Sequence, residues 1–128
     1  MIHISILRLP RLSRPEQQTS RAHVPEFIFK DNKDIPWVSS KFADGVEVKN
    51  LGKANGRALQ LVRFQPGASY PAHVHSDCEF IYVLEGEVFQ NGQRLTEGCS
   101  TVASVGTVDE TFVSPAGCLF LLFYGVDG

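Results

Sequence analysis

The sequence lacks long apolar runs, a disulfide pattern and any strong excess of charge, and each absence excludes a class of protein. No stretch of about 18 apolar residues occurs, so no membrane span is predicted. Its three cysteines are too few and too scattered for a disulfide framework, which indicates a reducing compartment and a cytoplasmic location. The net charge of −2, with no basic stripe, argues against a nucleic-acid partner.

Helical periodicity is also absent from any segment longer than about ten residues, and no repeat or heptad pattern is present. Short apolar or alternating segments are separated instead by glycine, proline and asparagine turns. This pattern predicts an all-β protein, an antiparallel sandwich or barrel. The length of 128 residues and the hydrophobic content of 43% fit a single domain over residues 23–128.

Residues 1–22 differ from the rest, because they are rich in arginine and contain one acidic residue, Glu16. We expect a mobile N-terminal tail here. An organelle transit peptide and a start codon placed too early are the alternatives, whereas the long apolar centre of a secretory signal is absent.

Two hairpins and a central strand are predicted from local pattern. Each hairpin has an Asn-Gly pair at its turn, a strong signal for two strands joined tightly. The last apolar run, CLFLLFY, has the continuous pattern of a buried central strand. The expected segments are a short strand over 26–29, a hairpin of 45–51 with Arg57–Phe64 around Asn55-Gly56, a hairpin of 87–90 with Gln93–Thr96 around Asn91-Gly92, and the central strand over 118–124.

The stretch over residues 67–86, GASYPAHVHSDCEFIYVLEG, carries the chemistry of the chain. Side chains alternate faces along a strand, so His73 and His75 should share a face, and Glu79 can return to it four residues later. Two imidazoles and a carboxylate predict a site for a divalent transition metal with open coordination positions. The alternative is that these are polar residues that line a cavity and hold no metal.

These residues resemble the first motif of the cupin superfamily, in which Gly67, His73, His75, Glu79 and Gly86 all have the family's spacing. The resemblance covers roughly residues 36–125. It implies the cupin double-stranded β-helix, a small jelly-roll barrel, and a metal bound by His73, His75 and Glu79. The aromatic lining of such a barrel is expected to come from Tyr70, Phe80, Tyr82, Phe89, Phe112 and Phe120. In cupins that cleave diketones or related compounds, this site would hold iron, and Glu79 would act as the catalytic residue that tunes charge or moves protons.

The second cupin motif is weaker here. Laid from Gly98, it meets Ser104 for the family's proline, Gly106 for its glycine, Asp109 for its histidine and Val113 for its asparagine. Asp109 could bind the metal directly, bind it through water or orient a histidine, and its neighbour Glu110 is an acid that could substitute. A site of two histidines and two carboxylates favours manganese or iron, although the residues alone leave iron, manganese, nickel and zinc open.

The stretch DETFVSPAGC, residues 109–118, resembles the end of the subgroup of cupins that form the sensor domain of zinc-dependent anti-sigma factors. Three functions therefore stay open: a metal-dependent enzyme of the dioxygenase kind, a non-catalytic module that senses a small molecule or a metal, and a metal-free structural barrel. The partner expected is a small-molecule ligand or substrate. The resemblance also implies a homodimer formed through strand exchange or sheet edges.

Overall fold

The structure is a computed structural model that describes residues 24–126, so the tail predicted over 1–22 lies outside the described residues. Within them, both Asn-Gly hairpins are confirmed. Strands β2 (Val46–Ala54) and β3 (Arg57–Phe64) pair antiparallel around Asn55 and Gly56, whose φ angles are 51° and 74°. Two consecutive residues with positive φ are what a tight hairpin turn of the right twist needs, and Asn-Gly supplies them with little strain. Strands β6 (Glu79–Gln90) and β7 (Gln93–Thr96) repeat this arrangement.

The remaining elements are short except for the last strand. They are η1 (Asn32–Asp34), β1 (Val38–Ser39), β4 (Ala68–Ser69), β5 (His73–Val74), β8 (Ser100–Ala103), β9 (Val108–Asp109), β10 (Phe112–Ser114) and β11 (Cys118–Gly125). No helix in the described part of the chain is long and apolar enough to cross a membrane.

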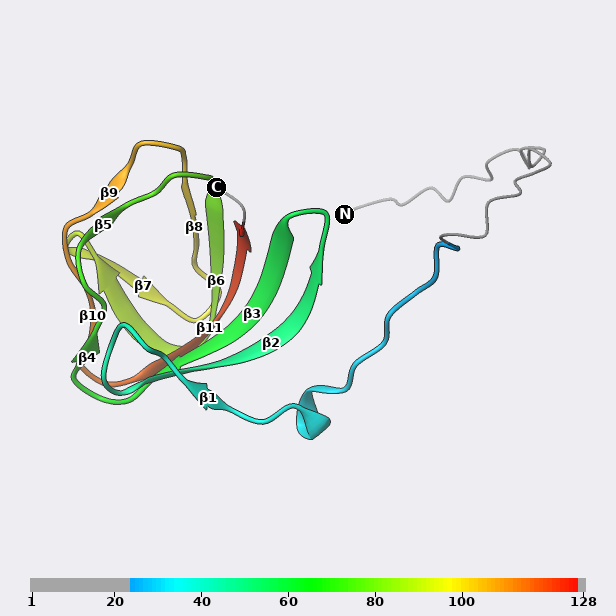
Figure 1. Cartoon of the computed structure of the whole chain (residues 1–128). Helices are drawn as coiled ribbons and strands as arrows, with labels where there is room; N and C mark the ends of the chain where they lie inside the picture. The colour runs from blue at the N-terminus through cyan, green and yellow to red at the C-terminus, as the bar shows by residue number, and fades with distance from the viewer. Residues whose placement is uncertain (1–23, 127–128) are drawn as a thin grey trace, which may run out of the picture.

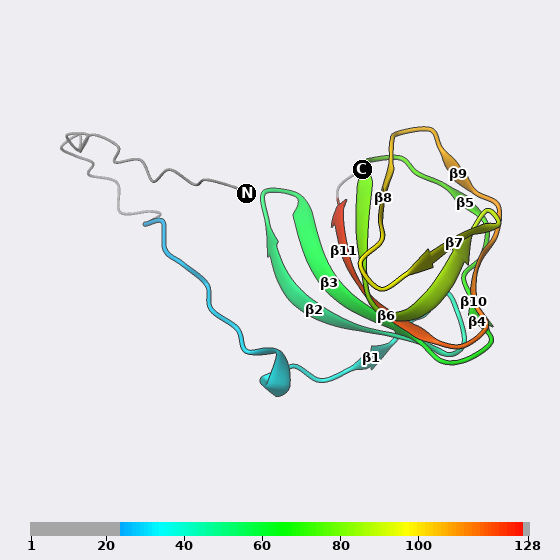
Figure 2. The same cartoon turned by 180° about the vertical axis from the view of Figure 1, so that it is seen from behind.

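The strands curl into a barrel, as Figure 1 and the view from behind in Figure 2 show. A nine-stranded sheet has the order β1-β2-β3-β11-β6-β10-β4, with β7 and β8 also paired to β6, and β5 and β9 form a separate pair. Every pairing is antiparallel. Strand β11 lies between β3 and β6, so the prediction that the apolar C-terminal run is a central strand is confirmed.

One difference from the sequence prediction lies at Gly86. The strand predicted over 87–90 begins just after this motif glycine, yet β6 runs through Gly86 and is 12 residues long. The strand bends there, because Gly86 has a φ of 79°. A side chain has no room at this position, because a Cβ would overlap the carbonyl oxygen of Gly117. The first half of β6 pairs with β8 and β11, and the second half pairs with β7 and β10. The bend therefore closes the barrel around its interior.

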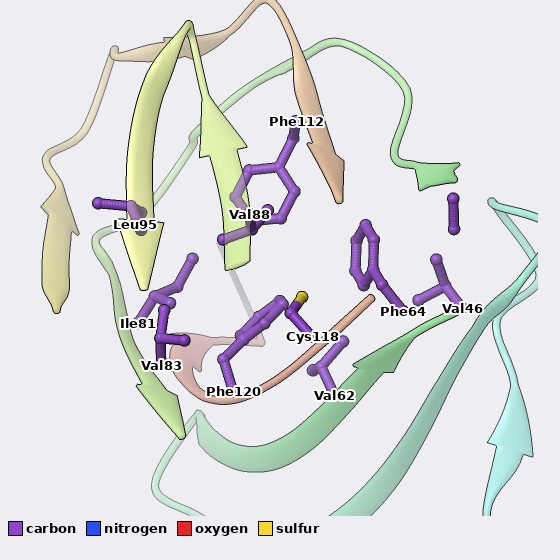
Figure 3. Close-up of a cluster of buried hydrophobic side chains, with 11 residues drawn as sticks. Val46, Val62, Phe64, Ile81, Val83, Val88, Leu95, Phe112, Cys118 and Phe120 are labelled. Carbon is purple, nitrogen blue, oxygen red and sulfur yellow. The ribbon is translucent and has the colours of Figure 1, made fainter. Parts of the chain in front are cut away.

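The barrel's inner face holds the core (Figure 3). The rings of Phe64, Phe112 and Phe120 pack together with centroids 5.5 to 5.8 Å apart. Cys118 is buried among them, as expected for a small core residue at the start of the last strand. Burial of such side chains is the main source of stability for a domain of this size.

Two sequence expectations are wrong. Residues 26–29 form no strand, and Phe27 and Phe29 are 85% and 86% exposed on a segment that extends away from the barrel (Figure 1). No neighbouring strand pairs with them in the described part of the chain. Phe80 and Tyr82, expected to line the barrel, lie on its outer face and are 46% and 47% exposed. Their position follows from alternation, because Glu79 and Ile81 in the same strand face inward.

Candidate metal site

Short strands at one end of the barrel bring the predicted ligand residues together. His73 begins β5 and is the direct partner of Asp109 in β9. The next backbone hydrogen bonds of this ladder run from the His75 N–H to the Thr107 carbonyl, 2.9 Å, and from the Gly106 N–H to the His75 carbonyl, 2.9 Å. Glu79 begins β6 on the inner face. All four residues therefore have their backbones fixed by sheet hydrogen bonds.

The side chains of these four residues converge. The Nε2 atom of His75 lies 3.5 Å from Oε1 of Glu79 and 3.4 Å from Oδ2 of Asp109. The Nε2 atom of His73 lies 3.8 Å from the same Asp109 oxygen. Ligand atoms of His73, His75 and Glu79 all lie within 4.8 Å of one another. Such a cluster of two imidazoles and two carboxylates has the composition of a transition-metal site.

Hydrogen bonds assign the same tautomer to both histidines. The Nδ1 atom of His75 lies 3.1 Å from the carbonyl oxygen of Thr107 and 3.0 Å from its hydroxyl, and Nδ1 of His73 lies 3.0 Å from the carbonyl of Pro71. A carbonyl only accepts, so each Nδ1 carries the proton. The Thr107 hydroxyl donates to the Ser104 carbonyl, which leaves its oxygen to accept from His75. Each Nε2 therefore presents a lone pair to the cluster, as metal-binding histidines do.

The Nε2 atom of His75 is buried and has no hydrogen-bond partner among the described residues. Its lone pair faces two carboxylate groups, which in their ionised form are also acceptors. A buried polar atom left without a partner costs roughly 1–3 kcal/mol. A divalent cation among these atoms would satisfy the lone pair and both carboxylates at once, so the residues present fit a metal ion.

Asp109 is held by a further residue that sequence reasoning missed. Its side chain is 7% exposed, and its Oδ1 atom accepts a hydrogen bond of 2.9 Å from the Gln90 amide, which leaves Oδ2 to face the histidines. The neighbouring Glu110 is exposed, and its backbone N–H donates to the side chain of Asn91. Of the two acids weighed from the sequence, Asp109 is the one that the structure brings into the cluster.

Thr107 and Gln90 have no recognisable sequence signal. Thr107 contacts a histidine 32 residues earlier, and Gln90 contacts an aspartate 19 residues later. Both contacts depend on the closure of the barrel. Partners of this kind fix the orientation of metal ligands, and their loss typically weakens metal affinity by about 10- to 100-fold.

Burial raises the pKa of Glu79, because the low-dielectric interior disfavours its charged form. The two histidines act in the opposite direction, and the negative charge of Asp109 adds to the increase in the pKa. Burial also raises the pKa values of Tyr70 and Tyr124, and the charge of Glu79 adds to both effects. A bound cation would lower the pKa of Glu79, because a nearby positive charge favours its ionised form.

The cluster lies at the wall of a cavity of about 620 Å³ inside the barrel. The residues that line it come from β2, β3, β5, β6, β9, β10, β11 and the segments over 38–42 and 70–71, and most are apolar or aromatic. A volume of this size, apolar with a few converging polar groups, is typical of a small-molecule site. Its lining includes the apolar side chains of Val62, Phe64, Phe112, Phe120 and Leu122, the two tyrosines Tyr70 and Tyr124, and the cluster residues His73, Glu79 and Asp109.

A barrel of this topology, with a His-x-His pair and a glutamate inside it, defines the cupin class of proteins. The chain belongs to the family described as the ChrR cupin-like domain, whose model matches residues 25–126. This match confirms the resemblance of the chain to cupins and to the cupin domains of anti-sigma factors. No curated protein sequence matches the chain.

Solved structures agree on the fold. An acetylacetone dioxygenase from Acinetobacter johnsonii superimposes with a TM-score of 0.68 at 13% identity, covering 86% of this chain and 80% of that one. The polyketide cyclase RemF from Streptomyces resistomycificus has a TM-score of 0.70 at 21% identity, covering 79% and 80%. The complex of Rhodobacter sphaeroides SigE with the anti-sigma ChrR gives 0.62 at 22% identity, covering 71% of this chain and 49% of that one. At these identities the likeness establishes the fold alone.

Proposed function

We propose that this protein is a metal-binding cupin that acts as a dioxygenase-type enzyme on a small oxygenated organic substrate. His73, His75, Glu79 and Asp109 would hold one divalent transition metal. The observation that carries the proposal is the buried Nε2 lone pair of His75, which faces two carboxylates 3.4 and 3.5 Å away and has no hydrogen-bond partner among the described residues. With both carboxylates ionised, this arrangement is unfavourable without a cation and favourable with one.

The chemistry of the donor set limits the metal. Carboxylate oxygens favour harder ions, so iron or manganese suits two histidines and two carboxylates better than zinc or nickel. When bound, the metal would act as a Lewis acid with open positions for an oxygenated ligand. Glu79 is the proposed catalytic residue, since its carboxylate faces both the cluster and the cavity and can offset charge or take up a proton.

The experiment loads the protein with Fe(II) under nitrogen and measures oxygen uptake after addition of acetylacetone or a catechol. We expect uptake in proportion to the substrate consumed, lost in the variant His73→Ala and kept in Glu110→Gln, whose exposed acid lies outside the cluster. Bound iron without oxygen uptake for either compound would contradict the enzymatic part of the proposal.

One observation favours a second function, a non-catalytic module that senses a small molecule or a metal. The family model that matches the chain is the one described by the cupin-like domain of ChrR, and a complex containing the anti-sigma ChrR is among the similar structures. The aspartate at position 109, where the cupin motif has a histidine, also distinguishes this site from the usual ligand set. In this case ligand binding would change stability while oxygen uptake stays at background.

We propose a cytoplasmic setting and a single cupin domain over residues 23–128. The thiols of Cys78, Cys99 and Cys118 are all free, which suits a reducing compartment. The family match over 25–126 supports one domain of nearly that extent. Limited proteolysis tests the domain boundary. A stable fragment that begins well after residue 38 would contradict it.

We also infer a homodimer in which a second copy covers the outer face of the sheet. Cross-strand pairing aligns Leu59, Phe123, Phe80 and Val102 in one row across β3, β11, β6 and β8, and each is more than a third exposed. A contiguous apolar row of this kind marks an interaction surface. We infer a second copy as the partner, because each copy offers the other an apolar surface. That surface consists of the same row and the exposed apolar side chains of residues 27–29.

Light scattering of the purified protein tests this contact. We expect twice the monomer mass for the parent and the monomer mass for Phe80→Lys. The matched control is Lys41→Glu, a change of charge at an exposed residue of the cavity-lining segment over 38–42, which is not part of the row. A monomeric parent, or a Phe80→Lys variant that stays dimeric, would contradict the inference.

A further inference from the structure

We propose that the phenol groups of Tyr70 and Tyr124 form the second half of the ligand site and bind an acceptor oxygen of a compact, largely apolar ligand. The inference rests on the proposed metal site, because it places this oxygen beside the His73 and Glu79 cluster. It extends the site to two residues from separate elements and specifies the chemistry of the ligand.

Tyr124 is positioned by the central strand. It is the direct cross-strand partner of Glu79 in the pairing of β11 with β6, and it faces the cavity together with Phe120 and Leu122. Directly paired residues of antiparallel strands have Cβ atoms roughly 4.5–5.5 Å apart. The phenol ring of Tyr124 therefore starts beside the carboxylate that begins β6.

Tyr70 reaches the same place from the opposite side. Its backbone N–H donates to the Phe112 carbonyl at 2.9 Å, which fixes it between β4 and β5. Its ring meets the His73 ring edge to face, with centroids 5.4 Å apart. Both tyrosines line the cavity that holds His73, Glu79 and Asp109. The two phenol groups and the cluster thus surround one part of the cavity.

Neither phenol hydroxyl has a hydrogen-bond partner among residues 24–126. A phenol at neutral pH carries its proton, so it can donate one hydrogen bond. Both tyrosines are only partly buried and line the cavity, so their hydroxyls are accessible from it and can donate to a ligand there. Two unpaired donors that face one cavity are therefore suited to a ligand oxygen that accepts two hydrogen bonds.

The rest of the cavity defines the body of the ligand. Most of the other lining residues are apolar, among them Val62, Phe64, Phe112 and Phe120, and the polar ones are Ser39, Ser40, Lys41 and Gln60. A carbonyl or enolate oxygen has two lone pairs and suits two phenol donors, while an attached hydrocarbon body suits these walls. The ligand class is therefore a small ketone, diketone or enolate with an apolar body.

The experiment measures calorimetric binding of acetylacetone to the protein loaded with Zn(II), which avoids oxidation of the probe. The variants are Tyr70→Phe and Tyr124→Phe, which keep the ring and remove only the hydroxyl. We expect each to weaken binding about tenfold, which is about 1.4 kcal/mol, at unchanged metal content. The matched control is Tyr82→Phe, which removes a hydroxyl on the outer face of the barrel and should leave binding unchanged.

Metal content is measured separately on every sample, so the two proposals fail in different ways. A parent that binds no zinc contradicts the metal site. A parent that binds zinc but no acetylacetone overturns the ligand class inferred here. Equal affinity in the parent and in both phenol variants overturns the role of the phenols, and tighter binding of butylamine than of acetylacetone would show that the carboxylates select a cation instead.

Discussion

Replacing Asp109 with asparagine should stabilise the metal-free protein and weaken its binding of metal. The two side chains have nearly the same shape. The Gln90 amide donates to Oδ1 of Asp109 and would keep the amide oxygen of the introduced asparagine at that position. The new amide N–H₂ would then replace Oδ2, which lies 3.4 Å from Nε2 of His75. It would give that buried lone pair the donor it lacks.

The magnitude follows from the contacts. An unpaired buried polar atom costs roughly 1–3 kcal/mol, and the substitution also removes a negative charge near Glu79. A shift of about 0.4 Å is still needed to reach ordinary hydrogen-bond length. We therefore expect a gain of about 1–2 kcal/mol, which for a domain of this size is roughly 5–10 °C in Tm. Loss of the carboxylate should weaken metal binding by at least about tenfold.

Thermal unfolding with chelator and with excess Mn(II) measures both effects. Without metal the variant Asp109→Asn should melt above the parent. With metal at about 100 times the parent's Kd, the parent should gain roughly 2.7 kcal/mol and a variant that binds about tenfold more weakly roughly 1.4 kcal/mol, so the advantage of the variant should shrink by about 1.3 kcal/mol. Glu110→Gln is the control and should follow the parent in both conditions. The reasoning is refuted if Asp109→Asn melts below the parent with chelator present, or if both proteins gain equally from metal.

Three further predictions concern other parts of the fold. Thr107→Val removes the hydroxyl 3.0 Å from Nδ1 of His75. It should weaken metal binding about tenfold with little loss of stability, which metal titration followed by calorimetry would measure. Unchanged affinity would contradict this prediction. Gly86→Ala should lower the free energy of unfolding in urea by more than about 3 kcal/mol, because the new Cβ would overlap a carbonyl oxygen. Gly98 has a similar positive φ but lies in open space, so Gly98→Ala should lower it by only about 1–2 kcal/mol. Equal losses in the two variants would count against the bend. Burial raises the pKa of the Cys118 thiol, so its thiolate forms only at higher pH than in an ordinary cysteine. Iodoacetamide at pH 8 should therefore label Cys118 only after unfolding, which peptide mass spectrometry checks; labelling in the folded protein would contradict its burial.

The sequence predicted the parts of the site whose spacing is local. His73, His75 and Glu79 lie within seven residues, and strand alternation alone places the two histidines on one face. The Asn-Gly turns were equally predictable, because few other residue pairs adopt two positive φ angles in succession. Glycine at position 86 was identified by the motif, but its role as a bend inside one long strand depends on the close approach of Gly117.

The parts that could not be predicted depend on long-range closure. The hydrogen bonds of Thr107 and Gln90 join residues far apart in sequence, and no local pattern marks them. The inward position of Asp109 could not be separated from that of Glu110 until its pairing with His73 was known. By contrast, the outward position of Phe80 and Tyr82 follows from strand alternation once Glu79 is placed inward. The expectation that these two aromatic residues line the barrel could therefore have been corrected from the sequence.

The central claim is that His73, His75, Glu79 and Asp109 bind one divalent metal ion. The most direct test is elemental analysis of untagged protein purified without chelator, beside His73→Ala and Glu110→Gln, repeated after loading with Fe(II) under nitrogen. We predict about one metal ion per chain in the parent and in Glu110→Gln, and almost none in His73→Ala. No bound metal in the parent even after loading, or equal metal in the parent and His73→Ala, would contradict the claim.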